Sequence, residues 1–155
     1  MSVQVNQTAK YSTVFLRLAL GIAFLSAVAD RFGLWGAPGA TNVAWGNFDS
    51  FLTYTAKLNF FLPNSLISVV GWLATGAEIV LGILLIVGFR IRETAFISGV
   101  MLILFAAAMT LALGVKVPLD YSVFAASAGA FLLAAQDESP WSIDKLLNQK
   151  NASPK

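Results

Sequence analysis

The chain has 155 residues and a formal net charge of +2, and 57% of its residues are hydrophobic while only 12% are charged. Soluble domains carry roughly 45–50% apolar and about 25% charged residues, so this chain has too little charge to cover a water-exposed surface. The composition argues against a soluble enzyme, a disordered chain and a nucleic-acid-binding protein, and it predicts an all-α integral membrane protein.

Four charge-poor runs are long enough to cross a bilayer, whose apolar core of about 30 Å takes roughly 20 helical residues. We predict a single domain over residues 1–155, folded as a four-helix bundle. Its segments in chain order are spans at about 11–30, 65–88, 94–115 and 119–136, a long outer loop over 31–64 and a cytoplasmic tail over 137–155.

The first run allows a second interpretation. Lys10 and Arg17 precede an apolar stretch that ends in Ala27-Val28-Ala29, and small residues in this pattern are typical of a secretory signal with its cleavage site. Cleavage would leave three spans, with the two ends of the chain on opposite sides of the membrane.

The outer loop divides into two halves. Gly and Pro punctuate residues 33–40, which we expect to be irregular. From Phe48 onward, apolar residues recur near one helical face and polar residues on another, and with Trp35, Trp45 and Tyr54 nearby this pattern predicts an interfacial helix. Such a helix serves either as a lid over the bundle or as a platform that guides a lipid-like molecule or a partner into it.

The tail begins with a sequence typical of a capped helix. Ser139 stands at the N-cap position, Pro140 in the first turn, and Trp141 where it would anchor the helix at the membrane interface. Beyond Asn148 we predict a disordered tail.

The Lys and Arg residues outside the spans predict the orientation, because cytoplasmic loops carry an excess of both. Six of them lie on the side of the two termini and the middle loop (Lys10, Arg90, Arg92, Lys145, Lys150, Lys155), and three lie on the other (Arg31, Lys57, Lys116). We therefore expect both termini in the cytoplasm of a bacterial cell, with the protein in its cytoplasmic membrane.

The chain contains no Cys and no His. Cys-based zinc and iron–sulfur sites are thereby excluded, as are the commonest metal ligand and the commonest general base. We expect no metal site and no intrinsic cofactor, and the residues offer no independent catalytic constellation.

Two ionisable residues of opposite sign lie in the interior of the predicted spans, away from their ends, Arg17 and Glu78, and each costs about 2.5–3.5 kcal/mol to insert. Their depths make an ion pair feasible. Thr75 and Gly82 share the helical stripe of Glu78, so we predict a small polar pocket formed by Arg17, Thr75, Glu78 and Gly82. The pair either fixes helix register, or it forms a site where Glu78 accepts a proton or binds a quinone-like head group.

Charges at the ends of the predicted helices are expected to be solvated. Asp30 and Arg31 close the first span and Asp120 opens the fourth. We do not expect these three residues to form a site.

Three segments carry a resemblance to the DoxX/DoxD family of small four-helix membrane proteins. Residues 17–25 are similar to its R-L-x-L-G-x-x-F-L opening, residues 78–88 to its E-x-x-x-G-x-x-L-x-x-G pattern, and residues 141–144 to its aromatic-Ser-Leu-Asp tail. The chain departs from the family at Val28, where a Gly is usual, and in its long outer loop. The resemblance implies a four-helix bundle and, as in some members, a place in a thiosulfate:quinone oxidoreductase or another membrane-bound redox complex.

Two functions follow as hypotheses. The first is a non-autonomous membrane subunit or accessory of a quinone-linked redox complex, which would need a soluble or membrane redox partner protein because this chain has no ligand set of its own. The second is a non-catalytic membrane scaffold that binds a partner or a lipid, with a structural Arg–Glu pair.

Overall fold

The computed structural model describes residues 7–136 and 140–152, and all of the regular structure in these ranges is helical. The helices are α1 (Gln7–Arg31), α2 (Phe48–Leu58), α3 (Asn64–Val87), α4 (Ile91–Leu113), α5 (Lys116–Asp120), α6 (Val123–Ala134) and α7 (Ile143–Ala152). The prediction of an all-α fold is confirmed.

Three of these helices, α1, α3 and α4, are long and apolar enough to cross a membrane. Much of their apolar surface faces outward, and Phe15, Leu73 and Leu104 are 74%, 68% and 62% exposed. A soluble protein rarely leaves so much contiguous apolar surface open to water, whereas lipid covers it at no cost. The prediction of a helical membrane protein is thereby supported.

The run predicted as one helix over 119–136 is divided into two. Ser122 adopts the left-handed backbone conformation between α5 and α6, with φ of 55°, and this conformation interrupts a right-handed helix. The 12 residues of α6 measure about 18 Å, which is less than the roughly 30 Å of an apolar core. A pattern of apolar residues does not reveal such a break, because both sides of it are equally hydrophobic.

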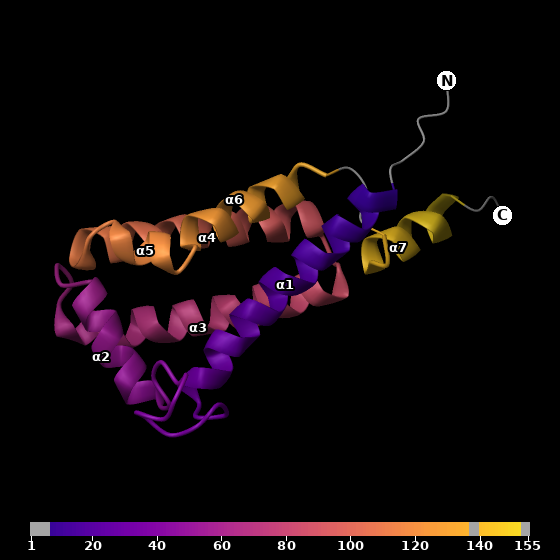
Figure 1. Ribbon diagram of the computed structural model, residues 1–155. Helices are drawn as coiled ribbons and strands as arrows, with labels where there is room; N and C mark the ends of the chain where they lie inside the picture. The colour runs from indigo at the N-terminus through magenta and orange to yellow at the C-terminus, as the bar shows by residue number, and fades with distance from the viewer. Residues whose placement is uncertain (1–6, 137–139, 153–155) are drawn as a thin grey trace.

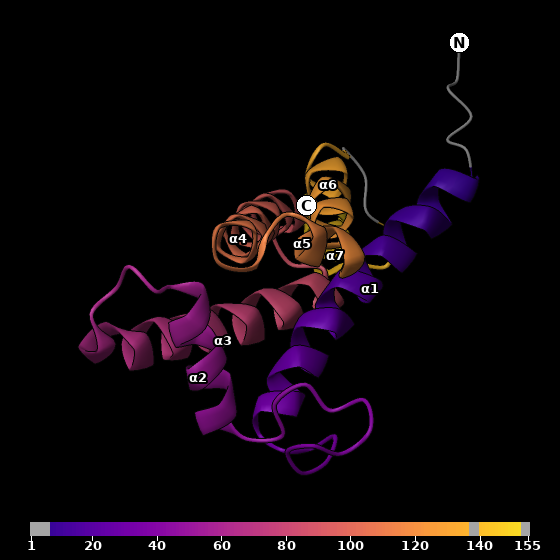
Figure 2. The same ribbon diagram turned by 60° about the vertical axis from the view of Figure 1, so that its left-hand side comes forward.

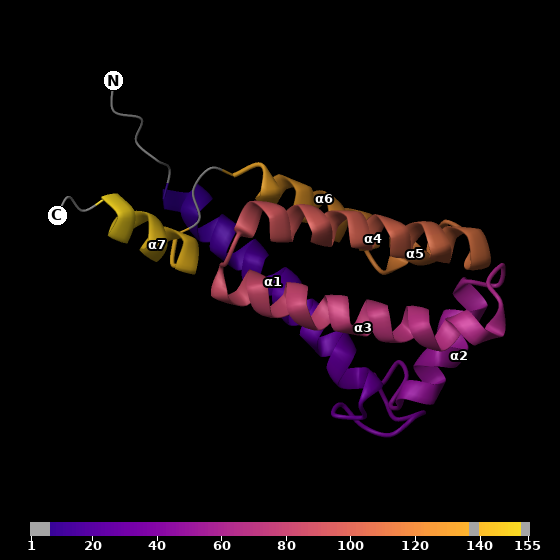
Figure 3. The ribbon, with the colours of Figure 1, turned by 180° about the vertical axis from the view of Figure 1, so that it is seen from behind.

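The helices form two layers, which Figures 1 and 3 show from opposite sides. In one layer α6 lies along α4, with α5 beside the last turns of α4. In the other layer α1 crosses α3 obliquely, as the turned view in Figure 2 makes clear. We call the end where α2 packs near the start of α3 the α2 end, and the end where α7 lies beside the α3–α4 turn the α7 end.

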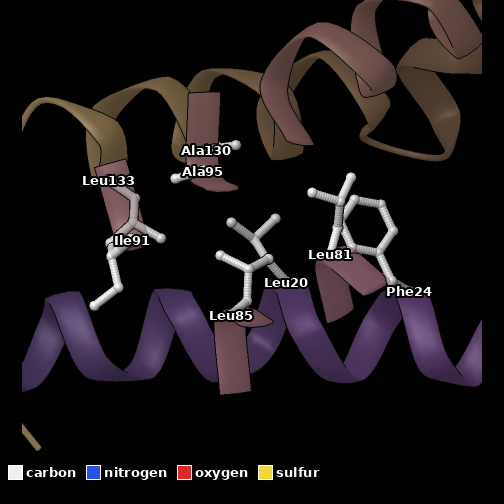
Figure 4. Close-up of a cluster of buried hydrophobic side chains, with 8 residues drawn as sticks. All are labelled: Leu20, Phe24, Leu81, Leu85, Ile91, Ala95, Ala130 and Leu133. Atoms are coloured by element: carbon white, nitrogen blue, oxygen red, sulfur yellow. The ribbon is translucent and has the colours of Figure 1, made fainter. Parts of the chain in front are cut away.

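A cluster of buried apolar side chains joins the four helices α1, α3, α4 and α6 (Figure 4). Each helix contributes two residues: Leu20 and Phe24, Leu81 and Leu85, Ile91 and Ala95, and Ala130 and Leu133. This cluster holds the two layers together.

The crossing of α1 and α3 depends on two glycines that face each other. A Cβ atom placed on Gly21 would lie 2.8 Å from the carbonyl oxygen of Gly82, and one placed on Gly82 would lie 3.1 Å from the carbonyl oxygen of Gly21. The two backbones therefore approach as closely as small residues allow. This contact fixes the register between the helices.

The helix predicted in the outer loop is confirmed as α2. The Oδ1 atom of its N-cap residue, Asn47, accepts a hydrogen bond of 2.7 Å from the amide of Ser50.

The tail helix differs from its prediction. The predicted cap Ser139 lies outside the described residues, and α7 begins only at Ile143, where the Ser142 Oγ atom accepts a 3.2 Å hydrogen bond from the Lys145 amide. The helix continues to Ala152, so the prediction of disorder beyond Asn148 is wrong for residues 149–152.

Candidate functional site

The partner of Glu78 is Arg31, at the end of α1. The Nη2 atom of Arg31 lies 2.7 Å from each carboxylate oxygen of Glu78, and its Nη1 atom donates a 2.9 Å hydrogen bond to Thr75 Oγ1. The two charged side chains are only 4% and 2% exposed. The pair of Glu78 with Arg17, which their depths made feasible, is not the pair that forms, although Glu78 and Thr75 do belong to one polar site.

The register of the α1–α3 crossing explains this exchange of partners. The two helices run antiparallel, so residues after Gly21 face residues before Gly82. Arg31 therefore meets Glu78, whereas Arg17 lies toward the end of α3, where a Cβ atom on Gly88 would come 2.6 Å from Arg17 Nη1. Gly82 itself lies in the helix crossing and contributes no polar group to the site.

Aromatic rings lie close to the Arg31 guanidinium. Its Cζ atom lies 3.9 Å from the ring centroid of Phe51 on α2 and 5.3 Å from that of Trp45 in the preceding loop. A cation close to an aromatic face is attracted by the negative face of the ring, and the rings also shield the ion pair from water. Arg31 therefore links α1, α2 and α3.

Asp30 fixes the loop that carries Trp45. Its carboxylate accepts hydrogen bonds from the amides of Ala44, Trp45 and Gly46, at 2.8, 3.0 and 2.9 Å. Gly46 has a φ of 69°, and a Cβ atom there would lie 2.3 Å from the nitrogen of Pro38, so only glycine fits. Asp30 and Arg31 are both buried, and the expectation that they are solvated is wrong.

Replacing Asp30 by Ala should release this loop, because three amides lose a charged acceptor at once. We expect a local destabilisation of about 2–3 kcal/mol. The measurement is hydrogen exchange of the full chain in detergent, which should accelerate over residues 33–47. Asp49→Ala, at an exposed position in the first turn of α2, is the control and should leave the exchange of that loop unchanged. Equal exchange in both variants would show that Asp30 does not hold the loop.

Helix α2 packs on the bundle and covers the site. A Cβ atom on Gly71 of α3 would come 2.5 Å from Leu52 Cδ2, so α2 lies directly against the α3 backbone. Burial raises the pKa of Tyr54, and the neighbouring Tyr121 raises it further. The contact of Leu52 with the α3 backbone is the packing that a lid over the bundle requires.

The site retains two buried polar atoms without a hydrogen bond. Within the described part of the chain, Glu78 Oε2 accepts none, despite its 2.7 Å approach to Arg31 Nη2, and Arg31 Nε donates none. A buried polar atom in this state raises the energy of the fold. The Oε2 atom of Glu78 can therefore accept a hydrogen bond from one further donor.

Arg17 is buried at the α7 end and binds the segment before α7. Its Nη2 atom donates a 2.8 Å hydrogen bond to the carbonyl oxygen of Trp141, and its Nη1 atom a 3.4 Å bond to that of Pro140. Asp144 also joins α7 to the start of α4, since its carboxylate accepts hydrogen bonds of 2.8 and 2.9 Å from the amides of Arg90 and Ile91. Residues 17 and 141–144, which lie in two of the family-like segments, thus meet in space.

Sequence reasoning missed Asp30, Arg31 and Asp144 as residues that organise the fold. The roles of Asp30 and Arg31 could have been suspected from their position, since the two adjacent charges end an apolar run and precede a loop rich in Gly and Trp. Among residues 7–136 and 140–152, no group of three or more Asp and Glu residues is placed to hold a metal ion. Comparison with family models, curated proteins and solved structures finds no match.

Proposed function

We propose that this chain is a DoxX-like accessory subunit of a membrane complex, without catalysis of its own. The observation that supports this function is that the buried charged side chains bind other parts of the same chain. Asp30 binds the loop, Arg31 and Glu78 join α1 to α3, and Arg17 binds the segment before α7. Charges committed to such internal contacts fix how the helices pack, which suits a chain that presents a surface to a partner.

The proposal includes a topology. The segment from α5 through α6 covers residues 116–134, and 19 residues at helical rise span about 28 Å, close to the thickness of an apolar core. As a fourth crossing it would place both termini on the side of the α3–α4 turn. The excess of Lys and Arg on that side favours the cytoplasm of a bacterial cell.

A second candidate is a quinone-linked redox role, in which Glu78 binds a quinone head group or accepts a proton. The observation in its favour is the unfilled acceptor Glu78 Oε2, buried beside Arg31 and near the Phe51 and Trp45 rings. The resemblance to a family with members in quinone-linked complexes supports it too. A redox partner protein would have to supply the electrons.

Glu78→Gln separates these two functions. The full chain is purified from membranes in a mild detergent, and bound quinone and co-purifying proteins are measured by mass spectrometry. The accessory role predicts a co-purifying partner that is retained in Glu78→Gln and no stoichiometric quinone. Glu93→Gln, at an exposed position on α4, is the matched control.

Near-stoichiometric quinone that is lost in Glu78→Gln but retained in Glu93→Gln would overturn the accessory role and establish the second candidate. The helical circular dichroism of both variants is recorded alongside, so that loss of the fold is distinguished from loss of a ligand.

A further inference from the structure

A hollow at the α7 end lies between the end of α3 and the first turns of α7. Its volume is about 350 Å³, and its walls include the apolar side chains of Val87, Trp141, Ile143 and Leu146. Lys145 supplies the one charged side chain in its lining. An apolar wall with a single cation beside it matches a ligand that is apolar along its length and anionic at one end.

The hollow lies beside the end of a helix that is long enough to cross a membrane. Val87 is the last residue of α3, one of the three helices that are long enough to cross a bilayer. The exposed rings of Tyr11 and Trp141 pack against each other there, with centroids 5.7 Å apart. Tyr and Trp are enriched at the level of lipid head groups, where one part of the ring is wet and the rest is in lipid.

The charges around the hollow complement an anion. Four basic residues belong to the α7 end, at the start of α1, the α3–α4 turn, the start of α4 and the start of α7: Lys10, Arg90, Arg92 and Lys145. The two carboxylates described at this end are already engaged: Asp144 accepts two amides of the α4 N-terminus, and Glu93 pairs with Arg90 at 3.1 Å. Lys145 forms no ion pair with any residue that the structure describes, so its charge is available to a ligand.

We infer that this hollow binds one anionic phospholipid. An acyl chain lies against Val87, Ile143 and Leu146, and the phosphate approaches the Lys145 ammonium from the membrane surface. Helix α7 is thereby held at the interface by lipid as well as by Arg17. This inference is independent of the accessory function, since it concerns a different end of the molecule from Glu78.

The test is native mass spectrometry of the full chain, released from neutral detergent after titration with phosphatidylglycerol or phosphatidylcholine. The expected result is retention of one phosphatidylglycerol per chain in preference to phosphatidylcholine. Lys145→Gln should weaken phosphatidylglycerol binding about five-fold, the effect of removing one basic residue near an anionic lipid. Lys57→Gln, an exposed lysine on α2 at the other end, is the control and should change nothing.

Leu146→Asp is the second variant, because it places a negative charge in the apolar wall at a side chain that is 66% exposed and does not support the core. It should abolish the preference for phosphatidylglycerol, and inorganic phosphate should not displace the bound lipid. Equal retention of both lipids by the wild-type chain, or equal losses in Lys145→Gln and Lys57→Gln, would overturn the inference. Displacement by inorganic phosphate would overturn it as well, since it would identify an anion site rather than a lipid site.

Discussion

Arg31→Ala is expected to lower the free energy of unfolding by about 3–5 kcal/mol, the cost of leaving one member of a buried ion pair without its partner. The Glu78 carboxylate would lose its donor on α1, while the Thr75 hydroxyl already donates to the carbonyl oxygen of Gly71. The measurement is denaturant unfolding of the full chain in detergent, followed by the helical circular dichroism signal.

Arg92→Ala is the matched control, because Arg92 is an exposed arginine on α4. It should change stability by less than about 0.5 kcal/mol. The double variant Arg31→Met with Glu78→Leu should recover most of the loss, since apolar residues of similar volume often replace a buried pair without cost. An Arg31→Ala chain as stable as Arg92→Ala would contradict the pairing.

Gly21→Val is expected to destabilise the fold by about 3 kcal/mol, at the upper end of the usual cost of overpacking. The first added atom would lie 2.8 Å from the carbonyl oxygen of Gly82 and 2.8 Å from Ile86 Cγ1, and a helix backbone cannot move aside as a flexible side chain can. Separation of α1 from α3 should also break the contact of Arg31 with Glu78. The same unfolding measurement applies.

Gly76→Val provides the comparison, since a Cβ atom on Gly76 meets nothing within 4 Å although this glycine lies in the same pair of helices. It should leave stability within about 1 kcal/mol of the original chain, because only helix propensity changes there. Similar losses in the two valine variants would mean that close approach at Gly21 is not what limits the fold.

Composition and periodicity predicted the helical membrane class and the helix α2, because both depend on local patterns of apolar residues. They could not predict the partner of Glu78. Arg17 and Arg31 are 14 positions apart on α1, and the choice between them depends on which glycines meet where α1 crosses α3. That register is set by the shapes of two surfaces together, which a single run of residues does not contain.

The break at Ser122 was missed for a related reason. Ser122 adopts a left-handed conformation that its residue type does not require, and the residues on both sides are apolar or small. The role of Asp144 was equally hidden, because the amides that donate to its carboxylate lie where the α3–α4 turn meets α4, more than 50 positions earlier. Tertiary contacts decide both features.

During translation, each of the two buried arginines is synthesised well before the group that it binds. Arg31 is made 47 residues before Glu78, and Arg17 is made 124 residues before Trp141. At about 5–20 residues per second, the ribosome leaves Arg31 without its carboxylate for at least about 2 s and Arg17 without its carbonyl for at least about 6 s. Of the described helices, α1 therefore waits longest for its contacts, and a chain released before residue 141 lacks the Trp141 carbonyl that Arg17 binds.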